Sequence, residues 1–572
     1  MSIPRHSILP RLNKPRPTWG PLDRGCYVLK PENTPLLSVA MTLADTLYCA
    51  NMEFFEDTNL KTFSPVSGEV IAEIEKTPPA EVKVLVERAR EAQKAWGALS
   101  LNGRSRKIKA LCGILAERTE EIAETISKET GKPLLESIYH EVFAAAELAR
   151  YFGSDTPKIL KKRRISIHLL KYRSSYLHYV PRGVIGIITP WNYPFTISFG
   201  DVVMALAAGN AVVLKPSEVT PTIGLKIKEV IEAAGIDPEL LQIAMGGGEV
   251  GAALVEGGTD MIHFTGSGRT GRIIAEACGR QLIPYVLELG GKDAAIVLDD
   301  ADLDYTAGAL VHGGFANTGQ ICASVERIYA LESVYEPLVK RIVEKVQGLR
   351  QGDGLREEVD VGPMIFPKQL SIVERQVAAA VEAGATVRTG GSSRDGRYFE
   401  PTVLTDVTDD MAVMREETFG PTLPIMKVKD VEEAIAKAND SRYGLSAYVF
   451  TRNTQRGREI AERLEAGTVD VNDVLLTHAI PETPWGGVKD SGIGVAHSAE
   501  GLRHFCQQRH VNYNILPSFA MPWVFPYQRR IAFAGVDFVK GLYGSSNLLK
   551  RLLHLLRGSW QVVMALRSSK KG

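Results

Sequence analysis

The residues best suited to chemistry are one cysteine and one glutamate. Cys322 follows a run of small and turn-forming residues, FANTGQI, which suits a reactive side chain presented on a loop. Glu288 stands in the run VLELGGK, where one acid interrupts an apolar, strand-like segment. A buried carboxylate is costly unless it is paired, so such a glutamate tends to be neutral, mobile or functional. A thiol nucleophile and a carboxylate base are the two groups that oxidation of an aldehyde to an acid requires.

Each residue also has an ordinary explanation. A single cysteine is more often an inert core residue than a nucleophile, and a glutamate that ends a strand is usually a solvated edge charge. Neither residue decides the function alone, so the neighbouring segments have to be considered.

Five further segments accompany these residues in a fixed order. GVIGIITPWNYPF at 183–195 reads as an apolar strand that enters a proline-bracketed turn, with an amide side chain at its apex. GNAVVLKPSE at 209–218 reads as a second buried strand that ends in a cation and an acid. The other segments are MIHF with TGSGRTGR at 261–272, EETFGP at 416–421 and WGGVKDSG at 485–492. In this order the segments strongly resemble those of the NAD(P)-dependent aldehyde dehydrogenase superfamily, over roughly residues 54–514.

The resemblance implies an α/β fold with a Rossmann-like cofactor domain, an α/β catalytic domain and a small β oligomerisation hairpin. Strands alternate with helices up to Glu288 and again from Asp293, which is typical of parallel sheets covered by helices. Before them, helical spacing begins at Ala80 and continues over 104–129 and 134–152.

The expected domains follow from this pattern. They are an NAD-binding domain at 54–163 and 181–287, oligomerisation strands at 164–180 and 497–514, and a catalytic domain at 288–496. The hairpin implies a homodimer or a homotetramer. Residues 1–53 are an irregular basic arm, for which a targeting peptide is the alternative, and 515–572 form a basic tail.

The cofactor expected from the resemblance is NAD. GSGRTG at 266–271 follows a strand and opens a helix, a context in which glycines admit a pyrophosphate to a helix N-terminus. Glu288 lies near the ribose-binding acid of a standard Rossmann fold, but in the resembled family that acid serves catalysis. The pair Lys215 and Glu218 holds the adenosine ribose instead, although without the family it would read as a solvated turn. A carboxylate at Glu218 would repel a 2′-phosphate, which favours NAD over NADP.

Other cofactor contacts are carried over by motif. Glu417 and Phe419 match positions that hold the nicotinamide ribose and pack beside the ring. The complete expected set is Thr189, Pro190, Trp191, Lys215, Ser217, Glu218, Gly248, Gly266, Ser267, Thr270, Leu289, Glu417 and Phe419.

The resemblance also implies a mechanism. Cys322 attacks the aldehyde carbon as a thiolate, and the Asn192 amide with the Cys322 backbone N–H stabilises the oxyanion. After hydride transfer to the nicotinamide, Glu288 activates the water that hydrolyses the thioester. Family members that pass the acyl group to coenzyme A usually lack this glutamate, so a free acid is the expected product. The alternatives are a semialdehyde-acid dehydrogenase, of the succinate semialdehyde type, and a catalytically silent scaffold of the same fold.

An apolar or long-chain aldehyde is the expected substrate. In the family the helix after the Asn192 turn lines the substrate tunnel, and residues 196–204 contain no arginine or lysine to pair with a substrate carboxylate. Gly200 and Ala316 are small where relatives often carry aromatic residues, which predicts a wide tunnel. Another loop could still supply the missing cation.

Composition excludes several other classes. Lys plus Arg and Asp plus Glu both number 67, so no global charge favours nucleic acid. The six cysteines show no paired spacing, which favours a reducing compartment such as the cytoplasm. No metal is expected, because His140-Glu141 is followed by Ala144 where a zincin helix needs its second histidine. No apolar run reaches the roughly 18–20 residues of a membrane span.

The C-terminal tail has a composition of its own. Asp537 is the single acid of residues 515–572, and aromatic residues are interspersed with many leucines. The cations of the tail are Arg529, Arg530, Lys540, Lys550, Arg551, Arg557, Arg567, Lys570 and Lys571. In residues 548–557 the cations fall near one helical face with His554, and leucines form a broad apolar face. This pattern predicts docking on an anionic membrane surface, such as the inner face of a membrane, and the alternative is a tail folded over protein.

Overall fold

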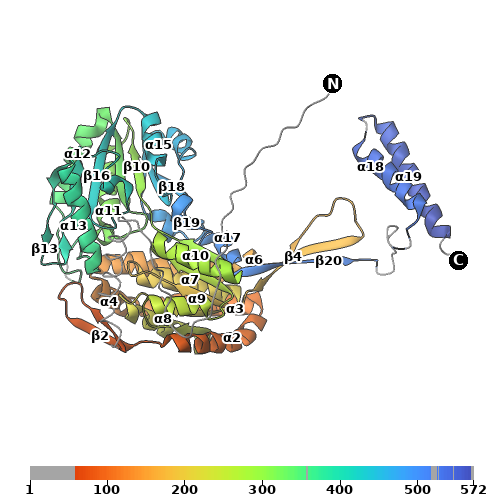
Figure 1. Cartoon of the computed structure of the whole chain (residues 1–572), viewed down its shortest axis with the longest axis horizontal. Helices are drawn as coiled ribbons and strands as arrows, with labels where there is room; N and C mark the ends of the chain where they lie inside the picture. The colour runs from red at the N-terminus through yellow and green to blue at the C-terminus, as the bar shows by residue number, and fades with distance from the viewer. Residues whose placement is uncertain (1–57, 356–357, 517–524, 526, 545, 569–572) are drawn as a thin grey trace, which may run out of the picture. The chain divides into compact units, whose positions relative to one another are not determined.

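The computed structural model describes residues 58–355, 358–516, 525, 527–544 and 546–568. Every helix and strand described below lies within residues 59–572 (Figure 1). The expected basic arm of residues 1–53 lies outside the described residues. Among the described residues, no helix is both long enough and apolar enough to cross a membrane.

A six-stranded sheet forms the first half of the fold. Its strand order is β19-β9-β8-β5-β6-β7, and all neighbours are parallel except the β19–β9 pair. The strands are β5 (Val184–Ile188), β6 (Ala211–Lys215), β7 (Leu241–Ile243), β8 (Met261–Thr265), β9 (Tyr285–Glu288) and β19 (Gly492–Ile493). The chain order reverses at β5, because β6 and β7 lie on one side of it and β8 and β9 on the other. A crevice for ligands is expected at the carboxyl ends of the strands beside such a reversal.

Helices cover this sheet and supply its loops. They are α2 (Val82–Ala98), α3 (Leu101–Glu117), α4 (Thr119–Thr130), α6 (Ala144–Ile159), α7 (Pro194–Ala208), α8 (Pro221–Ala233), α9 (Gly248–Glu256) and α10 (Gly268–Gln281). α7 is apolar all round and nearly every one of its residues is buried, so it is a central helix and not a surface one. The single helix expected over 104–129 is two helices, because Arg118 leaves the helical region at φ −107° and ψ 16°.

A seven-stranded sheet forms the second half. Its order is β12-β15-β16-β11-β10-β17-β18, parallel apart from the β12–β15 pair. The strands are β10 (Asp293–Val297), β11 (Val325–Leu331), β12 (Thr386–Thr389), β15 (Thr402–Thr405), β16 (Thr422–Val428), β17 (Ser446–Phe450) and β18 (Thr468–Val471). Its helices are α11 (Leu303–Phe315), α12 (Glu332–Gln347), α13 (Pro367–Glu382), α14 (Ala412–Arg415), α15 (Val431–Asn439) and α16 (Thr454–Ala461). Each half has its own cluster of buried apolar side chains, as expected of an α/β fold with two sheets.

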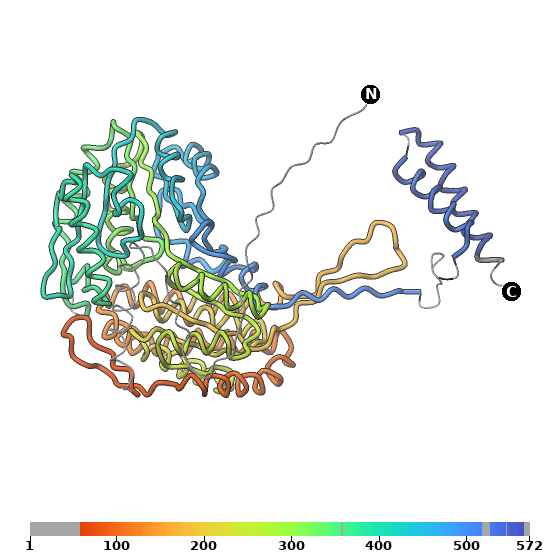
Figure 2. The backbone as a smooth tube through the Cα atoms, viewed as in Figure 1, coloured from red at the N-terminus to blue at the C-terminus, as the bar shows by residue number. Residues whose placement is uncertain are grey.

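A three-stranded sheet joins distant parts of the chain. β4 (Arg173–Pro181) pairs with β20 (Cys506–Asn514) along its whole length and with the short β3 (Arg163–Arg164), and the two long strands run side by side in Figure 2. The strand expected over 497–514 begins only at Cys506, because Ser498–His504 form the helix α17. Two small pairs, β1 (Asn59–Phe63) with β2 (Val70–Glu75) and β13 (Ser393–Arg394) with β14 (Tyr398–Phe399), complete the strands.

Two irregular helical stretches lie near the crevice. A helical segment starts with α5 (Leu134–Glu136), widens into the π-helical turn η3 (Ser137–Phe143) and continues as α6. A short 3-10 turn, η5 (Ala316–Gly319), precedes β11. The chain ends in two further helices, α18 (Arg529–Tyr543) and α19 (Leu548–Ser568). The helix expected within 548–557 is therefore part of a longer one.

Candidate active site

Cys322 lies where two cavities meet. The first cavity has a volume of about 290 Å³ and the second about 250 Å³, and Cys322 and Ile197 line both. Ten of the residues expected from the sequence line the first cavity: Pro190, Trp191, Asn192, Gly266, Ser267, Glu288, Leu289, Cys322, Glu417 and Phe419. They come together because β5, β8 and β9 are parallel neighbours whose carboxyl ends meet at one edge. A thiol between two cavities can contact one molecule from each.

The loop before Cys322 is held in an unusual backbone conformation. Asn317 and Thr318 have positive φ angles of 48° and 59°, and Gly319 follows at 70°. A side chain at Gly319 would collide with the carbonyl oxygen of Gly420, so only glycine fits there. Strained residues of this kind persist only where the surrounding structure fixes them, and they are common at functional sites.

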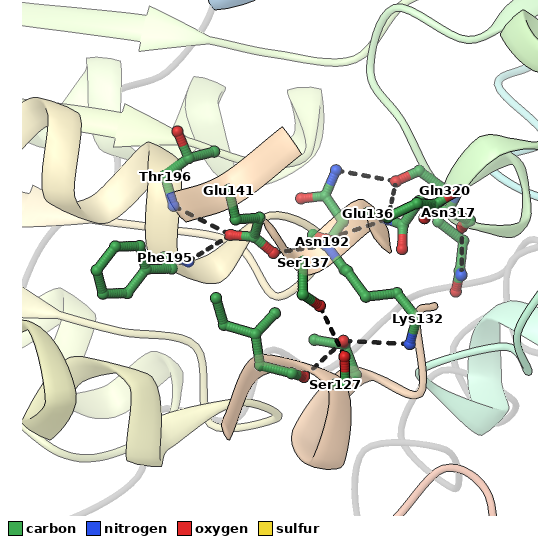
Figure 3. Close-up of polar contacts among 12 residues, drawn as sticks. Ser127, Lys132, Glu136, Ser137, Glu141, Asn192, Phe195, Thr196, Asn317 and Gln320 are labelled. Carbon is green, nitrogen blue, oxygen red and sulfur yellow. Dashed lines mark hydrogen bonds and ion pairs between the residues drawn. The ribbon is translucent and has the colours of Figure 1, made fainter. Parts of the chain in front are cut away.

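The Asn192 amide points at the same loop (Figure 3). Its Nδ2 donates to the carbonyl of Gln320 at 3.0 Å. The backbone oxygen of Asn192 accepts from Nδ2 of Asn317 at 3.0 Å and from Nζ of Lys132 at 2.8 Å. Because an amide nitrogen carries two N–H groups, the second remains for an oxyanion in the first cavity.

Three charged residues that sequence reasoning did not single out support these loops. Glu141 accepts from the backbone N–H groups of Phe195 at 2.8 Å and Thr196 at 3.0 Å, at the first turn of α7. Lys132 pairs with Glu141 at 2.6 Å, and Glu136 accepts from the N–H of Asn317 at 3.0 Å (Figure 3). The π-helical turn, with its i→i+5 hydrogen bonds, turns the two glutamates toward one side. Acids within a largely apolar helical segment were the only signal of this network in the sequence.

Glu288 ends β9 and lines the first cavity together with Cys322. Its side chain is buried, and neither carboxyl oxygen has a hydrogen bond of ordinary length among the described residues; the nearest donor is the backbone N–H of Ala496, which partly offsets the effect of burial on the charged form. Burial, with a smaller contribution from the charge of Asp201, raises the pKa of Glu288 well above its usual value. Once ionised, the carboxylate is therefore a stronger base than an exposed glutamate, and no ion pair holds it in place.

The thiol of Cys322 is protonated in this environment. Burial raises its pKa well above the ordinary value, and the charges of Asp293, Glu417 and Glu288 add to the effect. Since the thiolate is the nucleophile, the thiol needs a base or a nearby positive charge before it can react. An NAD⁺ ring in the first cavity would bring such a charge.

A second loop, which carries Glu417 and Phe419, is held in place by hydrogen bonds to a buried glutamate. Glu326 on β11 accepts from the N–H groups of Thr418 at 2.8 Å and Phe419 at 2.9 Å, and it forms a buried ion pair with Lys292. Burial and the charge of Glu326 raise the pKa of Glu417 to about 8.

The residues of this loop fit the nicotinamide end of a dinucleotide. The ring of Phe419 meets that of Trp191 edge-on, at 5.4 Å between centroids. Glu417 supplies hydrogen-bond acceptors for a ribose, and the two aromatic rings supply a surface for a planar ring.

Six expected cofactor residues lie away from the first cavity: Thr189, Lys215, Ser217, Glu218, Gly248 and Thr270. β5 lies between β6 and β8 in the sheet. The loop that follows β6 after Lys215 is therefore farther along the same sheet edge than the loop after β8. Lys215 Nζ contacts Glu218 Oε2 at 3.1 Å, and half of the Glu218 side chain is exposed. The hydroxyl of Thr189 is buried and accepts from Ser198, which indicates a packing role. Binding of the adenosine half by the Lys215–Glu218 pair stays a prediction.

The second cavity is lined mainly by apolar and aromatic groups. Its lining residues include no arginine or lysine, and its one acid is Asp473. Three histidines line it, and burial lowers the pKa of His140 and of His478 to about 4 and lowers that of His312. These imidazoles are therefore neutral near pH 7.

The prediction that Gly200 and Ala316 widen the substrate tunnel is wrong. Of residues 196–204 only Ile197 lines the second cavity, and neither Gly200 nor Ala316 does. A Cβ atom at Gly200 would lie 2.9 Å from Cδ1 of Leu148, so this glycine allows α7 to pack closely against α6. The cavity wall comes instead from η3, α11 and the segment 473–479.

Comparison with known proteins identifies the family of this chain. Residues 54–511 match the model of the aldehyde dehydrogenase family. A 4,4'-diapolycopene aldehyde oxidase of Methylomonas is 35% identical, over 86% of this chain and 93% of that protein. A betaine aldehyde dehydrogenase of Rhizobium leguminosarum is 37% identical, over 81% and 96%. The NAD⁺ complex of an aldehyde dehydrogenase from Bacillus cereus has a TM-score of 0.77 at 34% identity, covering 80% and 93% of the two chains. The chain belongs to the aldehyde dehydrogenase family.

Proposed function

We propose that this enzyme oxidises an apolar aldehyde to the free carboxylic acid with NAD. The observation that carries the proposal is the position of Cys322, which faces both cavities beside Asn192 and Glu288. A catalytically silent scaffold would have no use for a thiol, an unpartnered carboxyl group and an amide donor around one space.

The steps follow from the chemistry of these groups. The Cys322 thiol gives its proton to solvent water, and its sulfur adds to the aldehyde carbon from the second cavity. The Asn192 amide and the Cys322 N–H donate to the resulting oxyanion. NAD in the first cavity would accept the hydride that leaves this carbon. The thioester left on Cys322 is hydrolysed by water, whose proton Glu288 takes, and the acid departs as the thiol re-forms.

The lining of the second cavity supports an apolar substrate. No cation lines it to pair with a substrate carboxylate, and Asp473 would repel one. Neutral histidines and aromatic rings suit an uncharged chain. The name of the Methylomonas relative, which gives an aldehyde of diapolycopene as its substrate, supports the same direction. A semialdehyde acid such as succinate semialdehyde is the weaker candidate.

NAD is favoured over NADP by the half-exposed carboxylate of Glu218 beside Lys215. A 2′-phosphate placed near this carboxylate would be repelled.

A homodimer or homotetramer is supported by the β3-β4-β20 sheet. β3 is only two residues long, so most of the outer edge of β4 has no strand partner among the described residues, and another subunit could pair there.

A cytoplasmic location is supported by the cysteines. Cys112, Cys278, Cys322 and Cys506 are all free thiols among the described residues. A peripheral contact with the inner face of a membrane, through α18 and α19, belongs to the same proposal, since apolar aldehydes dissolve in membranes.

The test is NADH formation from a panel of aldehydes. Cys322→Ala should abolish NADH formation, because no other group can form the thioester. Cys112→Ala, which removes a half-buried thiol outside both cavities, is the control and should keep it. Activity that survives in Cys322→Ala would disprove the mechanism.

A further inference from the structure

The helices α18 and α19 form an antiparallel hairpin. Gly541 of α18 contacts Arg551 and Leu555 of α19, whereas Asp537 contacts His554 and Gln561, and Ala534 contacts Gly558. In these contacts, lower residue numbers in α18 pair with higher residue numbers in α19. This is the pattern of two antiparallel helices packed side by side.

The interface inside this hairpin is made of small and polar residues. Ala534, Gly541 and Gly558 are buried there. A Cβ atom at Gly541 would lie 2.6 Å from Cγ of Leu555, so the helices touch at a point where only glycine fits. Arg551 crosses the interface and donates to the carbonyl of Gly541 at 2.9 Å, at the end of α18. Few large apolar side chains are buried between the helices.

The single acid of the tail is enclosed in this interface. Asp537 is 6% exposed, and it accepts from Nδ1 of His554 at 2.8 Å and from Nε2 of Gln561 at 3.2 Å. Nε of Arg557 lies 3.4 Å from Oδ2 of Asp537. Because Asp537 is buried and paired with Arg557, the outer surface of the hairpin carries no acid among the described residues.

The large apolar side chains face outward instead. On α18 they include Phe533, Val539 and Tyr543, and on α19 seven residues recur at helical spacing, with exposed fractions from 48% to 78%. These seven are Leu548, Leu549, Leu552, Leu553, Leu556, Trp560 and Val563. A soluble helix pair normally buries such residues against each other, so the hairpin is inverted relative to an ordinary one. An exposed apolar surface of this kind marks a binding site for protein or membrane.

We infer that the outer surface of the α18–α19 hairpin binds an anionic lipid bilayer and lies in its interface. Exposed cations lie among these apolar residues on the same two helices, including Arg529, Arg530, Lys540 and Lys550. Cations and leucines together complement anionic headgroups and acyl chains, and exposed Trp560 and Tyr543 suit the boundary between them. α18 has 15 residues, too few for the about 20 that a spanning helix needs, and α19, with 21 residues, is not apolar enough to span. This inference rests on the proposed function only for the purpose of membrane binding. That purpose is to bring the enzyme to aldehydes dissolved in lipid.

The experiment measures sedimentation of the full chain with vesicles. One set contains equal parts of phosphatidylglycerol and phosphatidylcholine, and the other contains phosphatidylcholine alone. We expect the wild type to sediment with the anionic vesicles at low salt, and less so as the salt concentration rises.

Two full-length double variants separate the apolar and the electrostatic contributions to vesicle binding. Leu552→Gln with Leu556→Gln removes apolar contact at constant charge, and at least tenfold weaker binding is expected. Lys540→Gln with Lys550→Gln removes two cations, and about thirtyfold weaker binding to the anionic vesicles is expected at low salt, with a smaller salt dependence. The matched controls on other helices are Val84→Gln with Leu225→Gln and Lys83→Gln with Lys368→Gln, and these should bind like the wild type.

Several results would overturn the inference. These are no binding at low salt, equal binding to both vesicle types, or tail variants that bind like the wild type. A change of oligomeric state in the leucine variant, with vesicle binding intact, would assign the face to a protein contact instead. Oxidation of propanal, measured in parallel without vesicles, reports the proposed function separately, since sedimentation does not depend on turnover.

Discussion

Lys132 and Glu141 form a fully buried ion pair beneath the candidate active site. Their Nζ and Oε1 atoms are 2.6 Å apart, and both side chains are 0% exposed. Lys132 also holds the backbone carbonyl of Asn192, and Glu141 holds the first N–H groups of α7. The pair therefore connects the start of the central helix to the loop that presents the oxyanion donor.

Replacing Lys132 by Met should destabilise the fold by about 3–5 kcal/mol, because Glu141 is left as a buried, unpaired charge. kcat should fall as well, since Asn192 loses one of the donors that fix its loop. Denaturant unfolding and aldehyde turnover measure the two effects. The matched control is Lys128→Met, which breaks an exposed pair with Glu124 and should cost less than about 1 kcal/mol. Equal stability of the two variants would contradict the assignment.

The pKa of Glu288 predicts a pH-dependent deacylation step. Only the deprotonated carboxylate can take a proton from water, so the rate should rise as pH increases through the raised pKa. Glu288→Gln should release about one NADH per active site in a burst and then turn over slowly, without this acidic limb. Asp201→Asn removes a charge that raises the pKa, so the limb should move to lower pH. A steady-state rate unchanged in Glu288→Gln would exclude Glu288 as the base.

The raised pKa of Glu288 also affects the stability of the fold. Burial favours the neutral form of Glu288, so folding becomes less favourable as pH rises from the unfolded pKa toward the raised folded pKa. Glutamine resembles the neutral form and does not titrate. Glu288→Gln should therefore be more stable than the wild type at alkaline pH and equal to it at acidic pH, as thermal unfolding across pH can show.

Gly319→Ala should damage both stability and activity. The residue has φ 70°, and its Cβ would collide with the Gly420 backbone next to Phe419. We expect a loss above about 2 kcal/mol together with a higher KM for NAD, because both loops would have to move. Gly396→Ala is the control: it has φ 64° with no atom near its Cβ and should cost only about 1–2 kcal/mol. Similar losses in the two variants would mean that the contact with Gly420 is unimportant.

The absence of a cation around the second cavity predicts substrate preference. kcat/KM for octanal should exceed that for succinate semialdehyde at least tenfold. Leu476→Arg places a cation in the cavity lining and should reduce this ratio, whereas Leu225→Arg, on the distant helix α8, should not. A higher kcat/KM for succinate semialdehyde in the wild type would refute the apolar assignment.

The coenzyme preference should depend on Glu218. Glu218→Ser removes the carboxylate that would repel a 2′-phosphate, so the ratio of kcat/KM with NADP to that with NAD should rise several-fold. Glu232→Ser, which removes an exposed acid on α8, is the control for net charge. An unchanged ratio in Glu218→Ser would place the ribose contact elsewhere.

The sequence by itself determined the family, the α/β class and the group of residues around the thiol. Motifs in a fixed order carried this information, because Asn192, Glu288 and Cys322 each stand at the end of a strand or in a loop with recognisable neighbours. Ten of the expected residues line the first cavity for the same reason: parallel strands bring their carboxyl ends to one edge. The lack of cations in residues 196–204 and the helical spacing within residues 548–557 were also evident from the sequence.

Only the tertiary structure decided which side chains face each other. Gly200 was expected to widen the substrate tunnel, but it packs against α6, because the direction of a side chain depends on how α7 is rotated in the core. Lys132, Glu136 and Glu141 come together around the irregular segment formed by α5 and η3, which no local sequence pattern predicted. In the tail, Arg551 and His554 were grouped with the outer cations, yet both turn inward to α18, where carbonyl groups and Asp537 accept their hydrogen bonds. Helical spacing fixes which residues share a face, but the packing of two helices decides which face is buried.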